Sequence, residues 1–425
     1  MAKSLISEAV EAWSGLADFR TERERNKNYT YGRQWEDKIL VGNTFIRERD
    51  YITAQGQIPL QNNLIRRIVR NVMGVFRRRL AETMEDWSGA ARRLAADNSL
   101  YELFSRCMEE FLISGMVVAK CRKGKCGMKE GVWCEGISPS SFFFDSNTRD
   151  SSGKDANAVG QLHDVSLTDF CDAFVRTEKE YESALRLFGE AGAKGQGETL
   201  RVVELWRREK RPIRHKHLWR LRDVWRYYFL TSDGMVVRSG DSPYPHGSHP
   251  YIFKAYPFID GEIHSFVGDM LDQQRYTNRL ITMYDWVTRA SAKGVLLIPE
   301  GAIDGKYIED VASQWGKLNG VIVYRHQDGV PEPHQVITQG SHFAISELLD
   351  IQLKMLEDVS GVNGALQGNV DNGKISGTLY SQQTENAMTS LSDIMDTFMV
   401  FIKEAMDKTT SLMQINETNF VEERK

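Results

Sequence analysis

The stretch SGVNGALQGNVDNGKISGTLYSQQ, Ser360–Gln383, interrupts a region of the chain that otherwise has a helical pattern. Its first 18 residues contain five glycines, at Gly361, Gly364, Gly368, Gly373 and Gly377. Such a break can be a plain linker or a loop that binds phosphate. The Walker pattern GxxxxGK[ST] is absent, and no predicted strand precedes the segment. Its role therefore has to be found from the elements on either side.

Helical repeats flank this glycine-rich segment. Before it, the sequence predicts a helix over Phe266–Ala290, about 37 Å long at 1.5 Å per residue, and a second over His342–Val359. Between these helices, GVLLIPEGAI and GVIVYRHQDGVPEPHQVI have strand composition and predict a small β-rich insert. After the break, a third helix is predicted over Thr378–Met413. Its apolar stripe requires a partner helix and consists of Met388, Leu391, Met395, Phe398, Ile402 and Met406.

The first part of the chain predicts helices followed by short strands. Residues 1–28 have a helical stripe formed by Leu5, Ile6, Val10, Trp13 and Leu16. Another helix is predicted over Trp87–Gly115, and MVVAKCR, GVWCEGI and SFFFD predict the strands. Cys121, Cys126 and Cys134 lie close together in this strand region. Their spacing does not fit paired zinc knuckles, so we expect reduced thiols on a hairpin and no metal.

An arginine-rich helix is predicted within NNLIRRIVRNVMGVFRRR, residues 62–79. Apolar residues recur at helical spacing, and this stretch contains no acid to oppose its arginines, which are Arg66, Arg67, Arg70, Arg77, Arg78 and Arg79. The arginines form either a solvated helix face or a patch for phosphate or an acidic partner.

Residues 200–256 are strongly basic and alternate apolar with polar residues, which predicts strands. The interleaved tryptophans are Trp206, Trp219 and Trp225. Two interpretations remain open: a sheet with one buried and one wet face, which the pattern favours, and a platform for single-stranded nucleic acid. We expect the histidines of this region to lie on the surface or in loops; they are His215, His217, His246 and His249.

The totals exclude several classes of protein. The 425 residues carry a formal net charge of −4, which argues against a general nucleic-acid coat. No run of 18 apolar residues predicts a membrane span, and the N-terminus lacks the apolar stretch of a signal peptide, so a cytosolic origin is expected. Between Gly340 and Phe420, the sequence contains eleven acidic residues but only four lysines. That balance suits either an acidic solvated face or a surface past which DNA slides without sticking.

Several stretches together resemble the portal proteins of tailed bacteriophages. YTYGRQW (Tyr29–Trp35) is similar to an early aromatic element of that family, and NNLIRRIVRNVMG to the helix after it. ISPSSFFFDSNTRD resembles a strand that leads to an Asp-containing turn. YPFIDGEIHSFVGDMLDQQRYTNRLIT resembles the start of the family's stem, and SGVNGALQG with SGTLYSQQTENAMTSLSDIMD resembles the segment after it. The recurring positions at the start of the stem are Gly268, Asp272, Gln274, Arg275 and Asn278.

The resemblance implies an α+β, portal-like fold. It places an α/β wing at 1–265 (including the β-rich 200–256), a stem helix at 266–292, a β-rich clip at 293–339 and a second stem helix at 340–360. A tunnel loop at 361–377 and a return helix with a short crown at 378–425 follow. The five glycines named above would be hinges of the tunnel loop. Its DNA-facing side chains would be Asn369, Asp371, Asn372 and Lys374.

The implied function is structural, with no catalytic residues, metal or cofactor. Twelve copies would form a ring at one vertex of the virion capsid, assembled in the host cytoplasm. Double-stranded DNA would pass through it without sequence specificity. Its other partners would be the terminase large subunit, the head–tail adaptor, the major capsid protein and a scaffold protein, with no membrane. The alternatives are another head-completion or connector protein and, less favoured, a DNA-processing enzyme such as a nuclease.

Overall fold

The computed structural model of the chain separates into two compact units. Unit 1 contains Met1–Arg33, Asn63–Leu271 and Glu357–Lys425, and unit 2 contains Gln34–Asn62 and Asp272–Leu356. The structure describes residues 2–126, 129–193, 199–215, 218–293, 295–298, 305–316, 329, 334–336, 342–364, 366 and 377–422.

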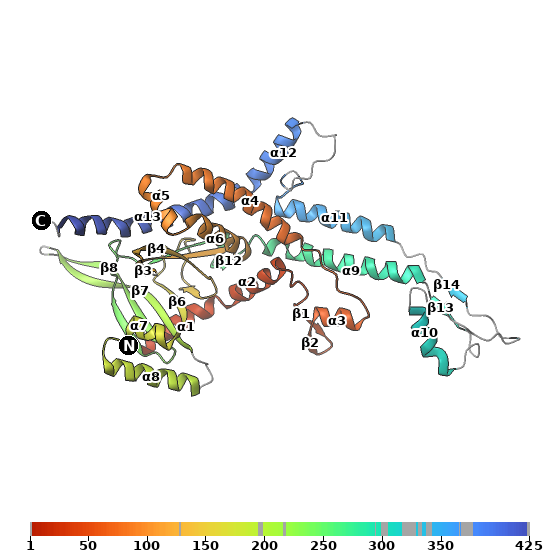
Figure 1. Ribbon diagram of the computed structural model, residues 1–425, viewed down its shortest axis with the longest axis horizontal. Coiled ribbons are helices and arrows are strands. Elements are labelled where there is room, and N and C mark those ends of the chain that lie inside the picture. The colour runs from red at the N-terminus through yellow and green to blue at the C-terminus, as the bar shows by residue number, and fades with distance from the viewer. Residues whose placement is uncertain are drawn as a thin grey trace. The chain divides into compact units, whose positions relative to one another are not determined.

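The helices and strands follow one another along the chain as shown in Figure 1. The helices are α1 (Ala2–Gly15), α2 (Ala17–Thr30), α3 (Glu48–Ala54), α4 (Leu64–Glu85), α5 (Gly89–Asp97), α6 (Leu100–Ser114), α7 (Leu167–Phe174), α8 (Glu178–Ala193), α9 (Leu271–Lys293), α10 (Ile308–Gly316), α11 (His342–Ser360), α12 (Gly377–Ser390) and α13 (Ser392–Glu422), with 3-10 turns at Gly268–Met270 and Gly305–Tyr307. The strands are β1 (Lys38–Val41), β2 (Thr44–Arg47), β3 (Met116–Cys126), β4 (Lys129–Ile137), β5 (Phe142–Phe144), β6 (Ala158–Ser166), β7 (Thr199–His215), β8 (Leu218–Thr231), β9 (Val236–Asp241), β10 (Tyr251–Ala255), β11 (Phe258–Ile259), β12 (Glu262–Ile263), β13 (Val295–Leu297) and β14 (His334–Val336).

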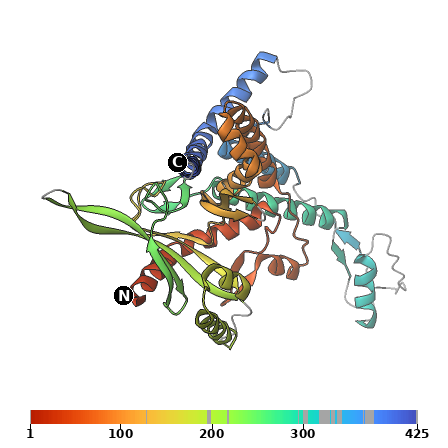
Figure 2. The same ribbon diagram turned by 60° about the vertical axis from the view of Figure 1, so that its left-hand side comes forward.

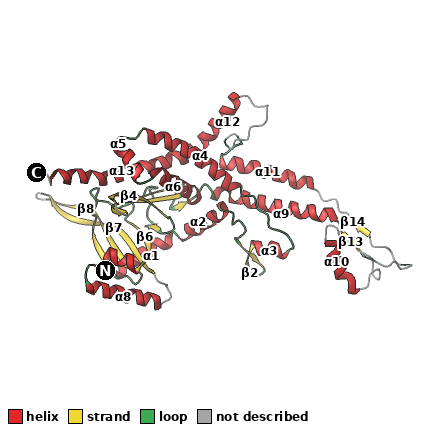
Figure 3. Cartoon of the chain, in the orientation of Figure 1, coloured by secondary structure: helices red, strands yellow, loops and turns green. Residues whose placement is uncertain are grey.

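Unit 1 is built on two antiparallel sheets. The larger has the strand order β5-β6-β7-β8-β9, and the smaller has the order β10-β3-β4. Figure 3 shows these strands beside the helices of the same unit. One hydrophobic core joins the two sheets to α1, and its fully buried aromatic residues include Phe142, Phe143, Tyr251 and Phe253. Antiparallel sheets with separate helices define the α+β class, as the sequence predicted.

A second part of unit 1 is helical and contains α4, α6 and α13. Phe398 of α13 is fully buried between Phe76 of α4 and Phe111 of α6, with ring centroids 5.1 and 5.5 Å away. The apolar stripe predicted on the third helix therefore packs against helices of the same chain. Its residues Leu391, Met395 and Ile402 are buried, as Phe398 is. Further along the same face, α13 packs on β3, β4 and β10, with Ala405 and Thr409 against Cys121 of β3.

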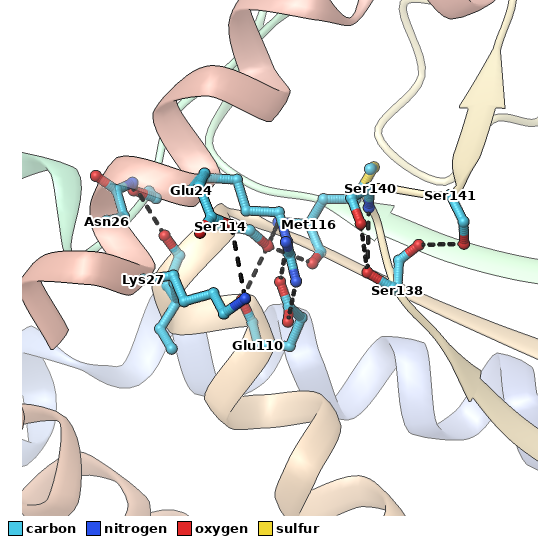
Figure 4. Close-up of polar contacts among 12 residues, drawn as sticks. Glu24, Asn26, Lys27, Glu110, Ser114, Met116, Ser138, Ser140 and Ser141 are labelled. Atoms are coloured by element: carbon cyan, nitrogen blue, oxygen red, sulfur yellow. Dashed lines mark hydrogen bonds and ion pairs between the residues drawn. The ribbon is translucent and has the colours of Figure 1, made fainter. Parts of the chain in front are cut away.

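The link between α2 and α6 is polar. Asn26 Nδ2 donates to the carbonyl oxygen of Ile113 at 3.0 Å. Arg23 forms a bidentate ion pair with Glu110, one hydrogen bond to each carboxylate oxygen. The Ser114 hydroxyl lies 2.8 Å from the carbonyl oxygens of Glu110 and Met116 (Figure 4). These bonds satisfy the end of α6 where the chain turns into β3.

Unit 2 contains α9, α10, most of α11 and the small hairpin of β1 and β2. Its β13 and β14 pair in antiparallel fashion, with Val295 opposite Val336. This pairing brings the C-terminal end of α9 close to the residues that precede α11. In Figures 1 and 2, α11 lies on one side of α9 and the β1–β2 hairpin with α3 lies on the other.

Several expectations about single elements were wrong. Residues 1–28 form two helices with a break at Leu16, and Val10, predicted to be in the apolar stripe, is 55% exposed. The predicted helices over Trp87–Gly115 and Thr378–Met413 are each divided into two. The insert between the long helices contains α10 in addition to β13 and β14, so its described residues are not purely β.

Candidate functional site

The glycine-rich segment is described only at its two ends. Gly361, Gly364 and Gly377 lie within the described residues, and Gly377 is the first residue of α12. The other predicted hinges and all the predicted DNA-facing side chains lie outside the described residues: Gly368, Asn369, Asp371, Asn372, Gly373 and Lys374.

The two ends of the excursion from α11 to the end of α12 meet at Gly361 and Ser390. Gly361 follows the last residue of α11 and has φ +65°, the left-handed conformation that commonly ends a helix and that favours glycine. The Ser390 hydroxyl lies 3.2 Å from the Gly361 carbonyl oxygen. A Cβ atom at Gly361 would lie only 2.6 Å from the Ser390 hydroxyl oxygen. Glycine at this position therefore permits both the turn and the close approach.

A pocket of about 260 Å³ adjoins this meeting point. Apolar side chains such as Leu112, Phe266 and Ile394 line it together with the three carboxylates of Asp269, Asp358 and Asp393. Burial raises the pKa of Asp269, and the charge of His264 partly opposes that rise. No Lys or Arg belongs to the described lining, so the pocket has an acidic character that repels phosphate.

The residues predicted at the start of the stem fall into two groups. Gly268 belongs to unit 1, where its N–H donates to the Ser265 hydroxyl at 2.9 Å; a Cβ atom there would approach that hydroxyl to the same distance. Asp272, Gln274, Arg275 and Asn278 lie on α9 in unit 2. Asp272 is exposed, whereas Gln274 and Asn278 are almost completely buried.

Buried amide groups fasten the segment 34–62 to α9 within unit 2. Gln274 donates to the Asn62 carbonyl oxygen at 2.7 Å and to Asn278 Oδ1 at 3.0 Å. Asn278 Nδ2 in turn donates to Gln34 Oε1 at 2.6 Å, and the Asn62 N–H donates to Asn278 Oδ1. The network joins the end of the YTYGRQW motif to the α9 motif. Both motifs stand out in the sequence, but nothing in it indicates that they pair.

An ion-pair cluster lies beside this amide network. Glu48, the first residue of α3, is 2% exposed and accepts hydrogen bonds from Arg275 and Arg279. Two arginines on one helix turn can satisfy both oxygens of a buried carboxylate. Removal of one partner would leave an uncompensated charge, so the cluster fixes where α3 sits on α9. The sequence did not single out Glu48 or Arg279, because nothing local distinguishes them from other charged residues.

The arginines of α4 mostly form a solvated helix face. Arg67, Arg70, Arg77, Arg78 and Arg79 are exposed, while the apolar side of the helix is buried. Acids from elsewhere in the chain do oppose two of these arginines: Arg66 pairs with Glu109 of α6, and Arg79 with Asp396 of α13.

The basic strand region is a sheet with one buried and one wet face. Trp206 and Trp225 are buried in the core, whereas the side chain of Trp219 lies outside the described residues. Charged neighbours offset the arginines, as in the pair of Arg211 with Asp241 at 2.8 Å and the pair of Arg207 with Glu8 at 3.4 Å. These observations favour the sheet interpretation over a nucleic-acid platform.

His246 and His249 lie in a loop, as predicted, but His249 is not on the surface. His249 is 8% exposed and packs edge-on against Trp225, with ring centroids 4.7 Å apart. Burial lowers its pKa well below the ordinary value, and burial also lowers the pKa of His246 to about 4. Both rings are therefore neutral near pH 7. His217 and the side chain of His215 lie outside the described residues.

Neither a metal centre nor a membrane-spanning helix is found among the described residues. Among them, no three His, Cys, Asp or Glu side chains gather closely enough to hold a metal ion. A membrane-spanning helix would need a longer apolar run than any helix in this part of the chain provides.

Comparison with known proteins identifies the family. The family model described as "Phage P22-like portal protein" matches residues 7–415, nearly the whole chain. A search of the curated proteins found no match. The chain belongs to the phage P22-like portal protein family. It is therefore a structural protein of the phage head–tail connector with a role in viral DNA packaging.

Proposed function

We propose that twelve copies of the chain form a closed ring at one capsid vertex, and that double-stranded DNA is packaged and ejected through this ring. The observation that carries the proposal is the path of the chain from α9 to Ser390. Two long helices are joined by the β13–β14 pairing, and an excursion closed at Gly361 and Ser390 follows. This order of elements is what we expect of a channel lined by helices with a loop that projects into it.

Each region then takes a role in the ring. Residues 1–265 are the wing, and 266–292 and 340–360 are the paired stem helices. Residues 293–339 are the clip, which docks the terminase large subunit during packaging and the head–tail adaptor afterwards. Residues 361–377 are the tunnel loop, and 378–425 are the return helix and a short crown. The wing contacts the major capsid protein and, during assembly, a scaffold protein.

Exposed apolar side chains on unit 2 support assembly with further copies. On α11, Leu348, Ile351 and Met355 are each more than 40% exposed and lie on one face of the helix. On the β1–β2 hairpin, Leu40 and Phe45 are directly opposite each other and are 60% and 70% exposed. Such clustered apolar surface marks an interface. Two different patches on one subunit are what a head-to-tail ring requires, because each subunit meets its two neighbours through different surfaces.

The charge near the tunnel loop supports passage of DNA without tight binding. The acidic pocket beside Gly361 repels the phosphate backbone at short range. Lys374 is the single cation in the segment 361–377, and a ring would multiply it into a positive collar. Contacts of this kind depend on salt and carry no sequence information.

Particle shape and mass test the proposal directly. The purified chain would be examined by negative-stain electron microscopy and mass photometry over a range of salt and protein concentrations. We expect rings with a central hole wide enough for duplex DNA and a mass of twelve subunits. Monomers or dimers under every condition, also in the presence of scaffold and capsid protein, would contradict the ring.

A further inference from the structure

Two thiols face each other across the β3–β4 hairpin in unit 1. Cys121 and Cys134 are direct partners in the antiparallel register, and their sulfur atoms are 3.8 Å apart. Both side chains are buried, at 0% and 6% exposure. The structure contains them as free thiols.

The backbone at this pair has the geometry that favours a short cross-strand link. The Cys121 N–H donates away from the hairpin, to the Pro250 carbonyl oxygen at 2.9 Å. The Cys134 N–H also donates elsewhere, to Asn98 Oδ1 at 2.8 Å. Neither thiol residue donates across the pair, so this is a non-hydrogen-bonded pair, in which Cα atoms are about 4.5 Å apart. That separation lies within the range that a disulfide spans.

Helix α13 covers the pair and polarises it. The Thr409 hydroxyl lies 3.1 Å from Cys121 Sγ, and Lys408, the neighbouring residue of the same helix, places its ammonium group nearby. The hydrogen bond from Cys134 is the largest effect on Cys121, and together with Thr409 and Lys408 it lowers the Cys121 pKa despite burial. Cys134 correspondingly keeps its proton, because its pKa is raised. Cys121 is thus the thiol that attacks first. Cys134 is placed to resolve because its sulfur lies 3.8 Å away, and its contact with Cys121, the largest cause of its raised pKa, is lost once Cys121 carries the small thiol.

We propose that Cys121 and Cys134 are a modification site, which a low-molecular-weight disulfide such as oxidised glutathione converts into a cross-strand disulfide. The Cys121 thiolate attacks one sulfur of the small disulfide, forms a mixed disulfide and releases one small thiolate. Cys134 then attacks Cys121 Sγ, forms the internal bond and releases the second small thiolate. The protons of the two cysteine thiols end on the two released small thiols, so atoms and electrons balance.

Formation of this bond is coupled to the docking of α13. The small disulfide reaches Cys121 only when α13 moves away from the hairpin, because Thr409 and Ala405 lie directly over the sulfur. The rate of oxidation therefore measures how often α13 opens. After oxidation, Cys121 no longer has a free thiol to contact Thr409, whereas β3 and β4 are held together covalently.

The third buried thiol of this region provides a built-in control. Cys107 of α6 lies below Gly136 of β4, where a Cβ atom would approach its sulfur to 3.2 Å. Burial raises the Cys107 pKa to about 12, which makes its thiolate scarce. Oxidation should therefore not involve Cys107, and Cys107→Ala should leave the reaction of the Cys121–Cys134 pair unchanged.

The experiment uses the full-length reduced chain, incubated with oxidised glutathione and sampled by free-thiol counting and non-reducing peptide mapping. The chain has five cysteines. We expect free thiols to fall from five to three, with one cross-link that joins the Cys121 and Cys134 peptides. Cys121→Ser and Cys134→Ser should each abolish this cross-link, whereas Cys107→Ala should not.

If α13 opens rarely, the small disulfide reaches Cys121 too slowly for the cross-link to be seen. A parallel measurement therefore determines when Cys121 is accessible. The reactivity of the two thiols toward an aromatic disulfide reagent is followed at rising, sub-denaturing urea until Cys121 becomes accessible. Accessible Cys121 that yields only a stable glutathione adduct, or a cross-link to Cys107 or Cys126, would overturn the proposal. Ring formation is measured separately, by particle images and mass. A negative result for the disulfide therefore does not contradict the ring, and the absence of rings does not contradict the disulfide.

Discussion

The Ser390 hydroxyl oxygen lies 3.2 Å from the Gly361 carbonyl oxygen, which joins two residues 29 positions apart at the base of one excursion of the chain. This contact depends on glycine in the left-handed conformation. The excursion that carries the predicted tunnel loop is therefore held at a defined base, and the following substitution tests that base.

Gly361→Ala should loosen the base of the excursion without unfolding unit 1. The left-handed conformation costs a non-glycine residue about 1–2 kcal/mol, and the new Cβ would meet the Ser390 hydroxyl at 2.6 Å. Hydrogen exchange should rise at residues 358–364 and 388–392. Adding Ser390→Ala should not restore protection fully, because the backbone strain remains. Gly189→Ala on α8, where nothing lies within 4 Å of the new atom, is the matched control and should leave exchange at these two segments unchanged.

Lys374→Glu should impair DNA packaging while rings still assemble. The change replaces the single cation of the segment 361–377 with an acid, so the proposed collar would repel the phosphate backbone. The measurement is the amount of nuclease-protected DNA in purified heads. Lys179→Glu, an exposed charge reversal on α8, is the control. Equal packaging by both variants would show that the loop does not grip DNA as proposed.

Phe398→Ala should destabilise unit 1 by about 3–5 kcal/mol, the usual cost of removing a buried phenylalanine. The ring is fully buried and contacts Phe76, Phe111 and Phe401. The double change Met395→Asp and Phe398→Asp should abolish soluble assembly, because it places two charges in this apolar region. Val400→Asp, at a residue 44% exposed on the same helix, should be tolerated. Urea unfolding and particle images distinguish these outcomes, and normal rings from the double variant would mean that the stripe is not buried.

Glu204 should make unit 1 sensitive to acid. Its carboxylate is 2% exposed and lies 2.6 Å from Lys120 Nζ and 2.8 Å from His163 Nε2. Burial opposes the charge, but Lys120 and His163 outweigh burial and lower the Glu204 pKa from 4.5 to about 2. Because the folded pKa is the lower one, the stabilisation is complete above pH 4.5 and is lost as the pH falls from 4.5 toward 2.

The pH dependence of the urea midpoint checks this expectation. Glu204→Gln should lower the midpoint near pH 7, because Lys120 loses its partner, and should flatten the decline below pH 4.5. Asp164→Asn, at an exposed ion pair with Arg201, is the matched control. An unchanged slope in Glu204→Gln would show that another group causes the acid sensitivity.

The sequence predicted elements with strong periodicity well and the breaks between them poorly. The apolar stripe on the third helix continues in phase across Leu391, so the sequence carries no local sign of the division between α12 and α13. That division coincides with the contact between Ser390 and Gly361, which is tertiary. The segment from β6 through α8 was not predicted, and neither was α10, which lies between the two predicted strand stretches, because short amphipathic helices give weak signals.

The residues predicted at the start of the stem show the same limit. Gln274, Arg275 and Asn278 were selected by resemblance, but their partners Gln34, Glu48 and Asn62 lie more than 200 positions away. Pairing over such a distance in sequence depends on the fold, and single-sequence patterns do not record it. Amide and carboxylate side chains also occur on most surfaces, so composition alone gave no reason to expect them inside unit 2.

The buried amides between segment 34–62 and α9 have a consequence for how that segment can attach. Apolar surfaces tolerate sliding, because one methyl group can replace another. Amide pairs do not, since a slip of one helical turn, about 5.4 Å, would separate Asn278 from Gln34 and Gln274 from Asn62. Each buried group left without a partner would cost about 1–3 kcal/mol. The segment 34–62 can therefore attach to α9 in only one register along the helix.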